Sequence, residues 1–199
     1  MTVVIVPLGH GNMGSLRRHV ERLGHGVEVW EGKGSMPAGD WLIIPGVGSL
    51  PGAEGALASA GLRAGIEGWR EQQRPILGIC LGLQLFFEKG EEGGSGFGWL
   101  PGEVPRLRAP VLPHIGWNEL EISDFTPPWL RRFEGAHLYF VHEFAVRPRN
   151  PEGVWMTTSY HQPFPSIVGS AGLIGLQFHP ELSGSVGEEL TQEIFTRGA

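Results

Sequence analysis

The stretch RPILGICLGLQLFF, residues 74–87, decides the fold of this 199-residue chain. It has the pattern of a buried apolar strand that turns sharply into a helix, with Cys80 at the turn. Gly78 and Gly82 flank the cysteine two residues away on either side, as in the thiol counterpart of the G-x-S-x-G nucleophile elbow. In such a tight turn, larger side chains at the two glycine positions would clash. The stretch therefore predicts an α/β sheet with Cys80 at the carboxyl end of a strand.

The cysteine has two interpretations, a nucleophile and a buried structural residue. Free cysteines are among the most buried residue types, so the residue alone leaves both open. At the start of a helix, backbone N–H groups and the helix dipole favour the thiolate, and the N–H of Leu81 would point towards a developing oxyanion. Because Cys80 is the chain's single cysteine, an intramolecular disulfide and a thiolate metal cage are excluded.

Segments on both sides of this stretch alternate between apolar runs and helical patterns, which indicates a parallel sheet covered on both faces. The expected strands of the first half are Thr2–Val6, Val27–Trp30, Trp41–Ile44 and Pro75–Ile79. The expected helices are 13–23, Leu57–Trp69, Leu81–Lys89 and, at the end, Gly187–Phe195. Strand-like pieces at His114–Ile122, Ala136–Val146, Val154–Ser159 and Leu173–Phe178 predict an antiparallel extension. We expect one α/β domain, residues 1–199, with its site at the carboxyl ends of the strands, where the strand order switches.

The stretch GLIGLQFHPELSG, residues 172–184, supplies a candidate base and carboxylate. His179 follows an expected strand, and Pro180 holds the link to Glu181 extended, so both side chains can project the same way. An imidazole that deprotonates a thiol, itself oriented by a carboxylate, gives a triad in Cys-His-Glu order. A lone histidine is more often structural. H-x-E also begins the zinc deaminase signature, but its P-C-x-x-C half is missing, and the histidines show no other convincing metal-ligand spacing.

The glycines near the amino terminus raise a different possibility, a dinucleotide-binding loop. Gly9, Gly11 and Gly14 form a G-x-G-x-x-G after an apolar run, with Glu31 at the distance of a ribose-binding acid. A hydride-transfer enzyme would leave the cysteine elbow and the H-x-E pair unexplained. Three glycines among 32 match many patterns by chance, so this alternative is disfavoured.

Composition excludes several other classes of function. The net charge is -6 and no cluster of Lys and Arg occurs, which argues against a nucleic-acid partner. The apolar run at the amino terminus is too short for a signal sequence or a membrane span. A single cysteine suits a reducing compartment. We therefore expect a cytoplasmic protein with no membrane partner.

Two motifs together resemble a known family: GICLG at 78–82, and QFHPE at 177–181 about a hundred residues later, are similar to the class I glutamine amidotransferases. Beyond them, GHGNMGSL (9–16), PHIGWNEL (113–120), LYFVHEF (138–144) and HPELSG (179–184) resemble the glutaminase subunits of imidazole glycerol phosphate synthases, nearly end to end. The resemblance implies a flavodoxin-like fold. It also implies hydrolysis of L-glutamine to glutamate and ammonia, with Cys80 as nucleophile, His179 as base and acid, and Glu181 as orienting carboxylate. It implies no metal and no organic cofactor. It also implies a heterodimer with a (β/α)8-barrel cyclase that uses the ammonia in histidine biosynthesis.

The same resemblance assigns further roles by position. The loop PGVGSL, residues 45–50, would supply the second oxyanion contact through a backbone N–H near Val47 or Gly48, beside that of Leu81. The implied glutamine-binding residues are Gln84, Glu92, Glu143 and Phe144. The implied partner-facing residues are Asn12, Ser15, Asn118 and Tyr139.

The sequence departs from the usual pattern of these subunits in four places, and none of them is in the triad. Glu143 stands where a small hydroxyl residue is usual, and Leu182 where Lys or Arg is frequent. Pro7-Leu8 replaces an Asp-Tyr pair, and Tyr160-His161 replaces a Tyr-Gly pair. The departures at Glu143 and Leu182 concern the details of substrate binding and partner contact. A glutaminase that serves a different acceptor synthase is an alternative, which PGVGS and PHIGWN disfavour. A non-catalytic regulatory scaffold and a thiol-dependent redox protein are also alternatives, but the intact Cys, His and Glu count against them.

Overall fold

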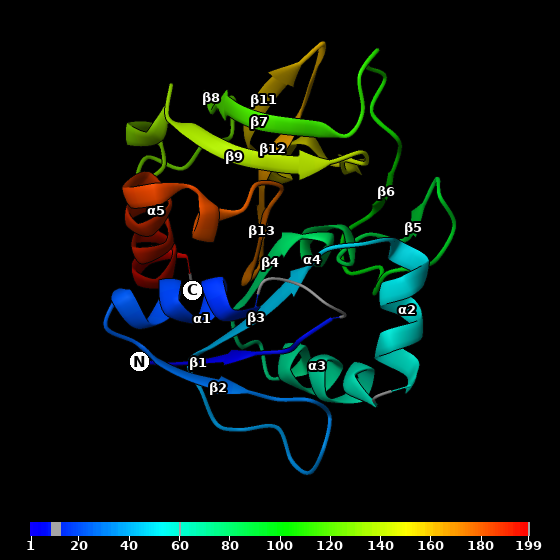
Figure 1. Cartoon of the computed structure of the whole chain (residues 1–199), viewed down its shortest axis with the longest axis vertical. Coiled ribbons are helices and arrows are strands. Elements are labelled where there is room, and N and C mark those ends of the chain that lie inside the picture. Colours follow the sequence, from blue (N-terminus) through cyan, green and yellow to red (C-terminus); the bar gives the residue numbers. More distant parts are fainter. Residues whose placement is uncertain (9–12, 60, 199) are drawn as a thin grey trace.

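The computed structural model describes residues 1–8, 13–59 and 61–198, and these form a large central sheet flanked by helices (Figure 1). Within these residues the sheet has eight strands in the order β2-β1-β3-β4-β13-β12-β11-β8, and four of its seven neighbouring pairs are parallel. The mostly parallel sheet with an antiparallel extension is thus confirmed. Its strands are β1 (Thr2–Ile5), β2 (Gly26–Val29), β3 (Trp41–Gly46), β4 (Ile76–Cys80), β8 (Glu121–Ile122), β11 (Val154–Tyr160), β12 (Gln162–Ser170) and β13 (Leu173–Leu176).

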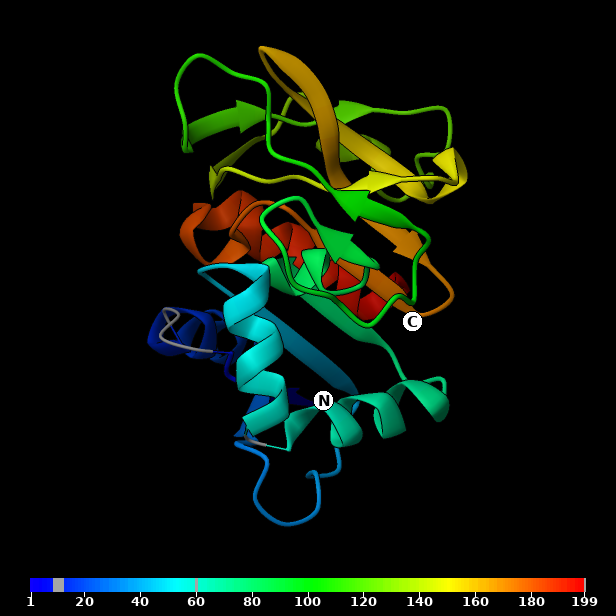
Figure 2. The ribbon, with the colours of Figure 1, turned by 90° about the vertical axis from the view of Figure 1, so that its right-hand side faces the viewer.

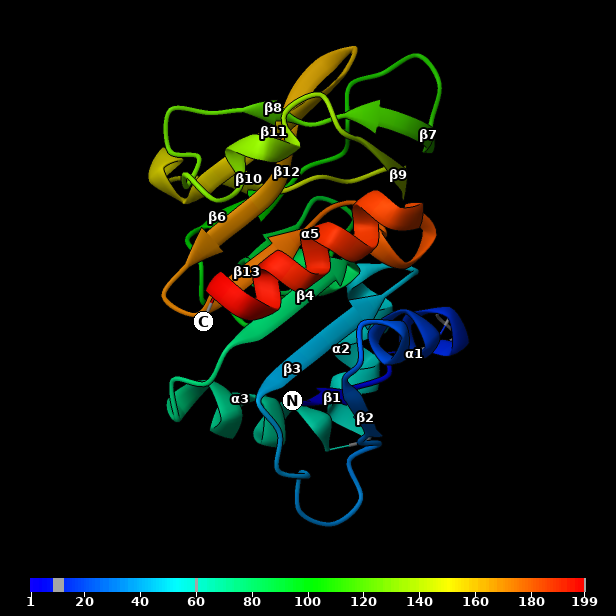
Figure 3. The same ribbon diagram turned by 90° about the vertical axis from the view of Figure 1, so that its left-hand side faces the viewer.

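The parallel strands are apolar on both sides because helices cover both faces of the sheet. Successive residues of β1 alternate between the two cores: Val3 and Ile5 pack into one cluster, and Val4 packs into the other. Figure 3 shows α1 (Met13–Arg22) and α5 (Gly184–Arg197) on the first face. Figure 2 shows α2 (Leu50–Ser59) and α3 (Leu62–Glu71) on the second. The carboxyl ends of the strands are left between these layers.

Smaller elements lie beyond the carboxyl ends of these strands. Strands β7 (His114–Glu119) and β9 (His137–His142) pair antiparallel into a ribbon, which Figure 1 shows crossing the top of the molecule. A small sheet in the order β10-β6-β5 lies to one side. The strands of this small sheet are β5 (Lys89–Gly90), β6 (Gly102–Val104) and β10 (Arg147–Pro148). The remaining short helices are α4 (Leu81–Gln84), η1 (Arg131–Phe133), η2 (Pro151–Gly153) and η3 (Pro180–Leu182).

The structure corrects two of the expected helices. The helix expected over Leu57–Trp69 is two helices, α2 and α3, which meet at Gly61 in the left-handed conformation with φ 67°. The helix expected over Leu81–Lys89 ends at Gln84. There the N–H groups of Phe86 and Phe87 bond three residues back instead of four, and both rings are fully buried. Core packing on all sides of 85–87 therefore ends the helix that the apolar pattern predicted.

The strands of the second half also differ in detail. The expected strand His114–Ile122 is broken at the buried Leu120 into β7 and β8, and the one expected over Ala136–Val146 ends at His142. Strand β12 was not predicted, because Pro163 and Pro165 give its first half the pattern of a turn. Gly9, Gly11 and Asn12 lie outside the described residues. Across the residues that are described, no helix is long and apolar enough to cross a lipid bilayer.

Candidate active site

Cys80 is the last residue of β4, and it adopts the conformation that the elbow requires. Its φ of 54° and ψ of −107° are unfavourable for a residue with a side chain, so the surrounding packing must hold the turn. A Cβ on Gly78 would lie 2.7 Å from the main chain of Gly82, and one on Gly82 would lie 1.7 Å from Ile44 O in β3. Both flanking glycines are therefore required by close backbone contacts.

His179 and Glu181 meet beside this turn, as their spacing predicted. His179 follows the end of β13, and its N–H donates to Tyr139 O in β9 at 2.9 Å. Its Nδ1 lies 2.8 Å from Glu181 Oε1, with both side chains more than nine-tenths buried. Because the carboxylate accepts, Nδ1 carries the proton in this pair. Within the described residues Nε2 has no hydrogen-bond partner, which leaves it free for proton transfer.

The electrostatics of the site couple the three groups. Burial acts to lower the pKa of His179, but the Cys80 and Glu181 side chains outweigh burial and raise it to about 10. A protonated imidazole between a carboxylate and a sulfur is the charge state that stabilises a thiolate. The arrangement can therefore present a nucleophilic sulfur and a proton donor together.

One residue next to the nucleophile was not identified from the sequence. Gln177 is fully buried, and its Nε2 donates to Cys80 Sγ at 3.7 Å, while the thiol itself lies 3.9 Å from Val141 O in β9. The signal that could have found Gln177 is its place two residues before His179 in an extended segment, which puts both side chains on the same side. Its amide is thus a polar contact to the sulfur.

The loop after β3 lies next to the triad. Gly46 is paired with Cys80 across the sheet, and Val47 lines a small pocket together with His179 and Glu181. Gly48 has φ 112°, which a side chain would strain. The strand order switches between β1 and β3, so the switch lies one strand away from Cys80 and next to this loop. Leu81 begins α4 directly after the nucleophile.

The four expected glutamine-binding residues are in two different situations. Gln84 is buried, and its Nε2 donates to Phe144 O at 3.0 Å, so these two form one wall beside the elbow. Glu92 instead accepts the N–H of Leu50 at the start of α2 at 2.8 Å. Glu143 is partly exposed and forms an ion pair with Arg106 at 2.9 Å. The carboxylates of Glu92 and Glu143 are thus directed at protein groups.

The expected partner-facing residues are not all together. Asn118 lies on β7 and Tyr139 on the paired strand β9, where Tyr139 packs edge-on against the exposed Trp117. Ser15 lies on α1 and accepts a hydrogen bond from Arg18 at 3.2 Å. Asn12 is outside the described residues.

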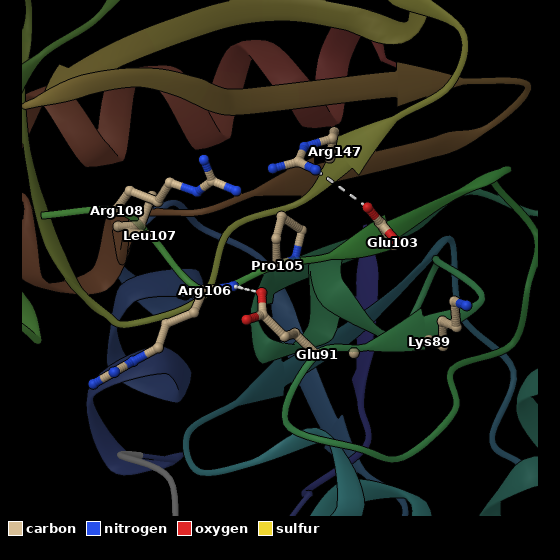
Figure 4. Close-up of a pocket in the computed structure, with 9 residues that line it drawn as sticks. Lys89, Glu91, Glu103, Pro105, Arg106, Leu107, Arg108 and Arg147 are labelled. Atoms are coloured by element: carbon tan, nitrogen blue, oxygen red, sulfur yellow. Dashed lines mark hydrogen bonds and ion pairs between the residues drawn. The ribbon is translucent and has the colours of Figure 1, made fainter.

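A larger and strongly charged pocket of about 530 Å³ lies away from the triad, beside β5 and β6 (Figure 4). Its carboxylates already have partners: Glu91 accepts the N–H of Arg106, and Glu103 pairs with Arg147 at 3.2 Å. No triad residue lines this pocket, and its charged groups are separate from the Cys80–His179–Glu181 site. Among the described residues no group of three His, Cys, Asp or Glu side chains is placed to hold a metal ion.

Comparison with known proteins gives consistent matches. The family model for "Glutamine amidotransferase class-I" matches residues 5–197. The chain is 42% identical to the imidazole glycerol phosphate synthase subunit HisH of Moorella thermoacetica, over 94% of this chain and 91% of that protein. It is 40% identical to the subunit of the same name from Methanopyrus kandleri, over 98% of both. The solved structure of PurLQS from Thermotoga maritima has the same fold, with a TM-score of 0.77 at 17% identity over 100% of this chain and 99% of that one.

Proposed function

The chain belongs to the class I glutamine amidotransferases, and we propose that it is the glutaminase subunit of an imidazole glycerol phosphate synthase. The observation that carries the proposal is the arrangement of Cys80, strained at the end of β4, beside the buried His179–Glu181 pair joined at 2.8 Å. Relatives that match 94% and 98% of this chain carry that subunit's name, which supports the choice among acceptor synthases.

In the proposed reaction Cys80 Sγ attacks the carboxamide carbon of glutamine, and negative charge develops on the carboxamide oxygen. The N–H of Leu81 and an N–H from the loop at Val47 and Gly48 stabilise this oxyanion. His179 Nε2 then donates its proton to the leaving nitrogen, the C–N bond breaks and ammonia departs, leaving a glutamyl thioester.

Water completes the cycle. His179, now neutral, removes a proton from the attacking water, and the thioester C–S bond breaks to give glutamate. Glu181 holds the imidazole in the tautomer with Nδ1–H throughout, and it stabilises the imidazolium each time it forms. Gln177 remains hydrogen-bonded to the sulfur, where it favours the thiolate as leaving group.

We place the glutamine side chain between the elbow and the wall formed by Gln84 and Phe144. This wall lies close to the nucleophile in the chain: Val141, whose carbonyl oxygen contacts Cys80 Sγ, is only three residues before Phe144. The Glu92 carboxylate acts from outside by fixing the start of α2, the helix that follows the oxyanion loop. Glu143 contributes its main chain to the wall, while its side chain pairs with Arg106.

The second subunit is proposed to be a (β/α)8-barrel cyclase that receives the ammonia. The support is a set of exposed apolar side chains. Val111, just before β7, is 64% exposed, and Ile115 and Trp117, on β7, are 58% and 53% exposed. Val47 and Leu182, also exposed, flank the triad itself. Such side chains are typical of a protein–protein interface, and a covered site would keep ammonia from protonation in water. Asn118 and Tyr139 lie on the same ribbon.

The test is glutamate release from glutamine by the wild type and by Cys80→Ala. Each is measured alone and with a cyclase subunit plus its ribonucleotide substrate. We expect release that is strongest in the complete mixture and absent in Cys80→Ala, with unfolding curves showing that the variant is folded. Strong release that does not depend on the cyclase would support the triad and contradict the assignment to this synthase. No release under any condition would favour a non-catalytic scaffold.

A further inference from the structure

A chain of side-chain hydrogen bonds runs through the β7–β9 ribbon towards the active site. At its outer end Asn118 Nδ2 donates to Ser159 O at 3.2 Å. Asn118 Oδ1 lies 2.8 Å from His114 Nε2, and His114 Nδ1 lies 3.1 Å from His142 Nε2. At the inner end His142 Nδ1 lies 2.9 Å from Phe144 O. Both histidines are buried, and they face each other as partners across the two strands.

The protons of this chain can be counted, because both of its ends are backbone carbonyls, which only accept. Phe144 O requires a proton on His142 Nδ1. Ser159 O requires the NH₂ of Asn118, so the amide oxygen faces His114 and requires a proton on its Nε2. With both rings neutral, two bare nitrogens would then face each other at 3.1 Å. Turning the amide of Asn118 over only moves the conflict, because its oxygen would then face Ser159 O.

We propose that His114 and His142 share one extra proton, and that this singly charged pair positions the Phe144 carbonyl and Gln84 in the glutamine pocket. With the extra proton, every contact in the chain has one donor and one acceptor. The second half of the proposal rests on the proposed function, since it takes Gln84 and Phe144 as the wall of that pocket. His114 and His142 are thus positioning residues that act through Phe144.

The surroundings lower the pKa of both rings, and they do so more strongly for His142 than for His114. Burial lowers the pKa of His114, and it lowers the pKa of His142 to about 3, with the nearby His179 acting in the same direction. The hydrogen bond to Asn118 acts to raise the pKa of His114. The extra proton therefore belongs to His114 and is donated to His142. The pair takes up one proton where two isolated histidines would take up two.

The groups packed around the pair are mainly aromatic. Tyr160 of β11 and Phe140 of β9 both stack on His114, with ring centroids 4.0 Å and 5.2 Å away. Phe164 of β12 contacts His142 edge-on, with ring centroids 5.0 Å apart. Ring faces of this kind stabilise a cation. The hydroxyl of Tyr160 is directed away, to the backbone of Val111.

The titratable side chains near the inner end are already engaged. His179 pairs with Glu181, and Glu143 pairs with Arg106. In the part of the chain that the structure describes, neither His114 nor His142 forms an ion pair. Neutral groups, the hydrogen-bond chain and the aromatic rings, are therefore what stabilises the charge of the dyad.

The link to the substrate site is the Phe144 carbonyl, which accepts from two groups at once. His142 Nδ1 reaches it from the ribbon at 2.9 Å, and Gln84 Nε2 reaches it from α4 at 3.0 Å. If the hydrogen bond between the two histidines is lost, His114 no longer fixes the ring of His142. The Phe144 carbonyl, which accepts from both His142 and Gln84, then loses its fixed position. Loss of the shared proton should therefore raise the KM for glutamine more than it lowers kcat.

Nitrogen-15 NMR of the histidine-labelled chain tests the shared proton directly, because protonated and bare ring nitrogens have well-separated shifts. His114→Gln and His142→Gln assign the signals. We expect that, as the pH falls from about 8 to about 5, the pair takes up one proton and keeps a single bare nitrogen between its two rings. Two bare nitrogens, one in each ring, that persist to about pH 5 in the folded protein would overturn the proposal.

Kinetics of the complex with the cyclase test the positioning role. His114→Gln offers an uncharged N–H donor to His142, so we expect it to keep a KM for glutamine close to that of the wild type and to lose its pH dependence. His114→Phe keeps the ring volume without a donor, and its KM should rise about tenfold. An unchanged KM in a folded His114→Phe, or the wild-type pH dependence in His114→Gln, would contradict the role. If the wild-type complex releases no glutamate, the proposed function fails, while the NMR result still decides whether the proton is shared.

Discussion

Replacing Gly82 by alanine leaves all catalytic groups in place but adds a methyl group where the structure has no space for it. The added Cβ would lie 1.7 Å from Ile44 O and 2.7 Å from Ile44 C, both in the main chain of β3. To restore even a 3.0 Å contact from 1.7 Å, α4 and β3 must move apart by at least 1.3 Å. No change of rotamer relieves this clash, because both sides are backbone.

We expect this shift to lower both stability and activity. Overpacking of a close-packed site costs about 1–3 kcal/mol, and a backbone clash belongs at the upper end, about 3 kcal/mol. A displacement of about 1 Å next to a nucleophile costs about 100-fold in rate. Urea unfolding gives the first quantity, and kcat/KM for glutamate release in the complex gives the second.

Gly68→Ala is the matched control for this substitution. Gly68 lies inside α3, and a Cβ there would meet nothing within 4 Å. Alanine in a helix interior should therefore stabilise the chain by about 0.5–1 kcal/mol and leave the rate unchanged. A Gly82→Ala variant as stable and as active as the wild type would refute the close approach of α4 to β3, and with it the steric argument for the elbow.

Three further predictions concern charge. Glu181→Gln should fold and lose about 10³-fold or more in kcat, because an amide no longer fixes the imidazole tautomer. NMR titration of this variant should show that the pKa of His179 is lowered. A loss of less than tenfold in kcat would contradict the triad. On the acid side, the folded pKa of His142 is about 3, below the about 6.5 of an unfolded chain. As the pH falls, the unfolded chain therefore binds this proton before the folded chain does. The free energy of unfolding should fall from pH 6.5 towards pH 3 by up to about 1.4 kcal/mol per pH unit. Denaturant unfolding of His142→Gln at several pH values should show a smaller decrease per pH unit than the wild type. Glu143→Ser should change the free energy of unfolding by less than about 1 kcal/mol, because the ion pair with Arg106 is substantially exposed; a large rise in its KM for glutamine would show that the carboxylate binds substrate after all.

The parts of the fold that could be predicted from the sequence are those set by local pattern. Strands β1, β3 and β4 are continuous apolar runs, and Gly78 and Gly82 around Cys80 mark the turn that follows β4. His179 and Glu181 are two residues apart on one short segment, so their contact depends little on the rest of the chain. Such features are encoded within a few residues.

The parts that could not be predicted depend on contacts between distant segments. The length of α4 is set by the burial of Phe86 and Phe87, and the apolar pattern of 81–89 fits a longer helix equally well. The contact of His114 with His142 exists because the register of β7 against β9 places them opposite each other. Neither a register nor a shared core can be read from one segment alone.

The two departures beside the triad differ in what they can change. Four hydrogen bonds hold the main chain of 143–145. Leu107 N–H donates to Glu143 O at 2.8 Å and Ala145 N–H donates to Pro105 O at 3.1 Å, while Phe144 O accepts from Gln84 Nε2 at 3.0 Å and from His142 Nδ1 at 2.9 Å. The wall of the proposed pocket is therefore built of backbone groups, and its position does not depend on the side chain at residue 143.

Leu182 is in a different situation, because its side chain is 38% exposed next to the His179–Glu181 pair. The resemblance leads us to expect Lys or Arg at this position, but this chain presents an apolar side chain next to Ser183, whose hydroxyl accepts the N–H of Tyr139 in the ribbon at 3.0 Å. A partner that fits it must offer an apolar group where a carboxylate would otherwise suffice. The departure at residue 143 is thus compatible with unchanged chemistry, whereas the one at residue 182 changes a surface that belongs to the proposed interface with the cyclase.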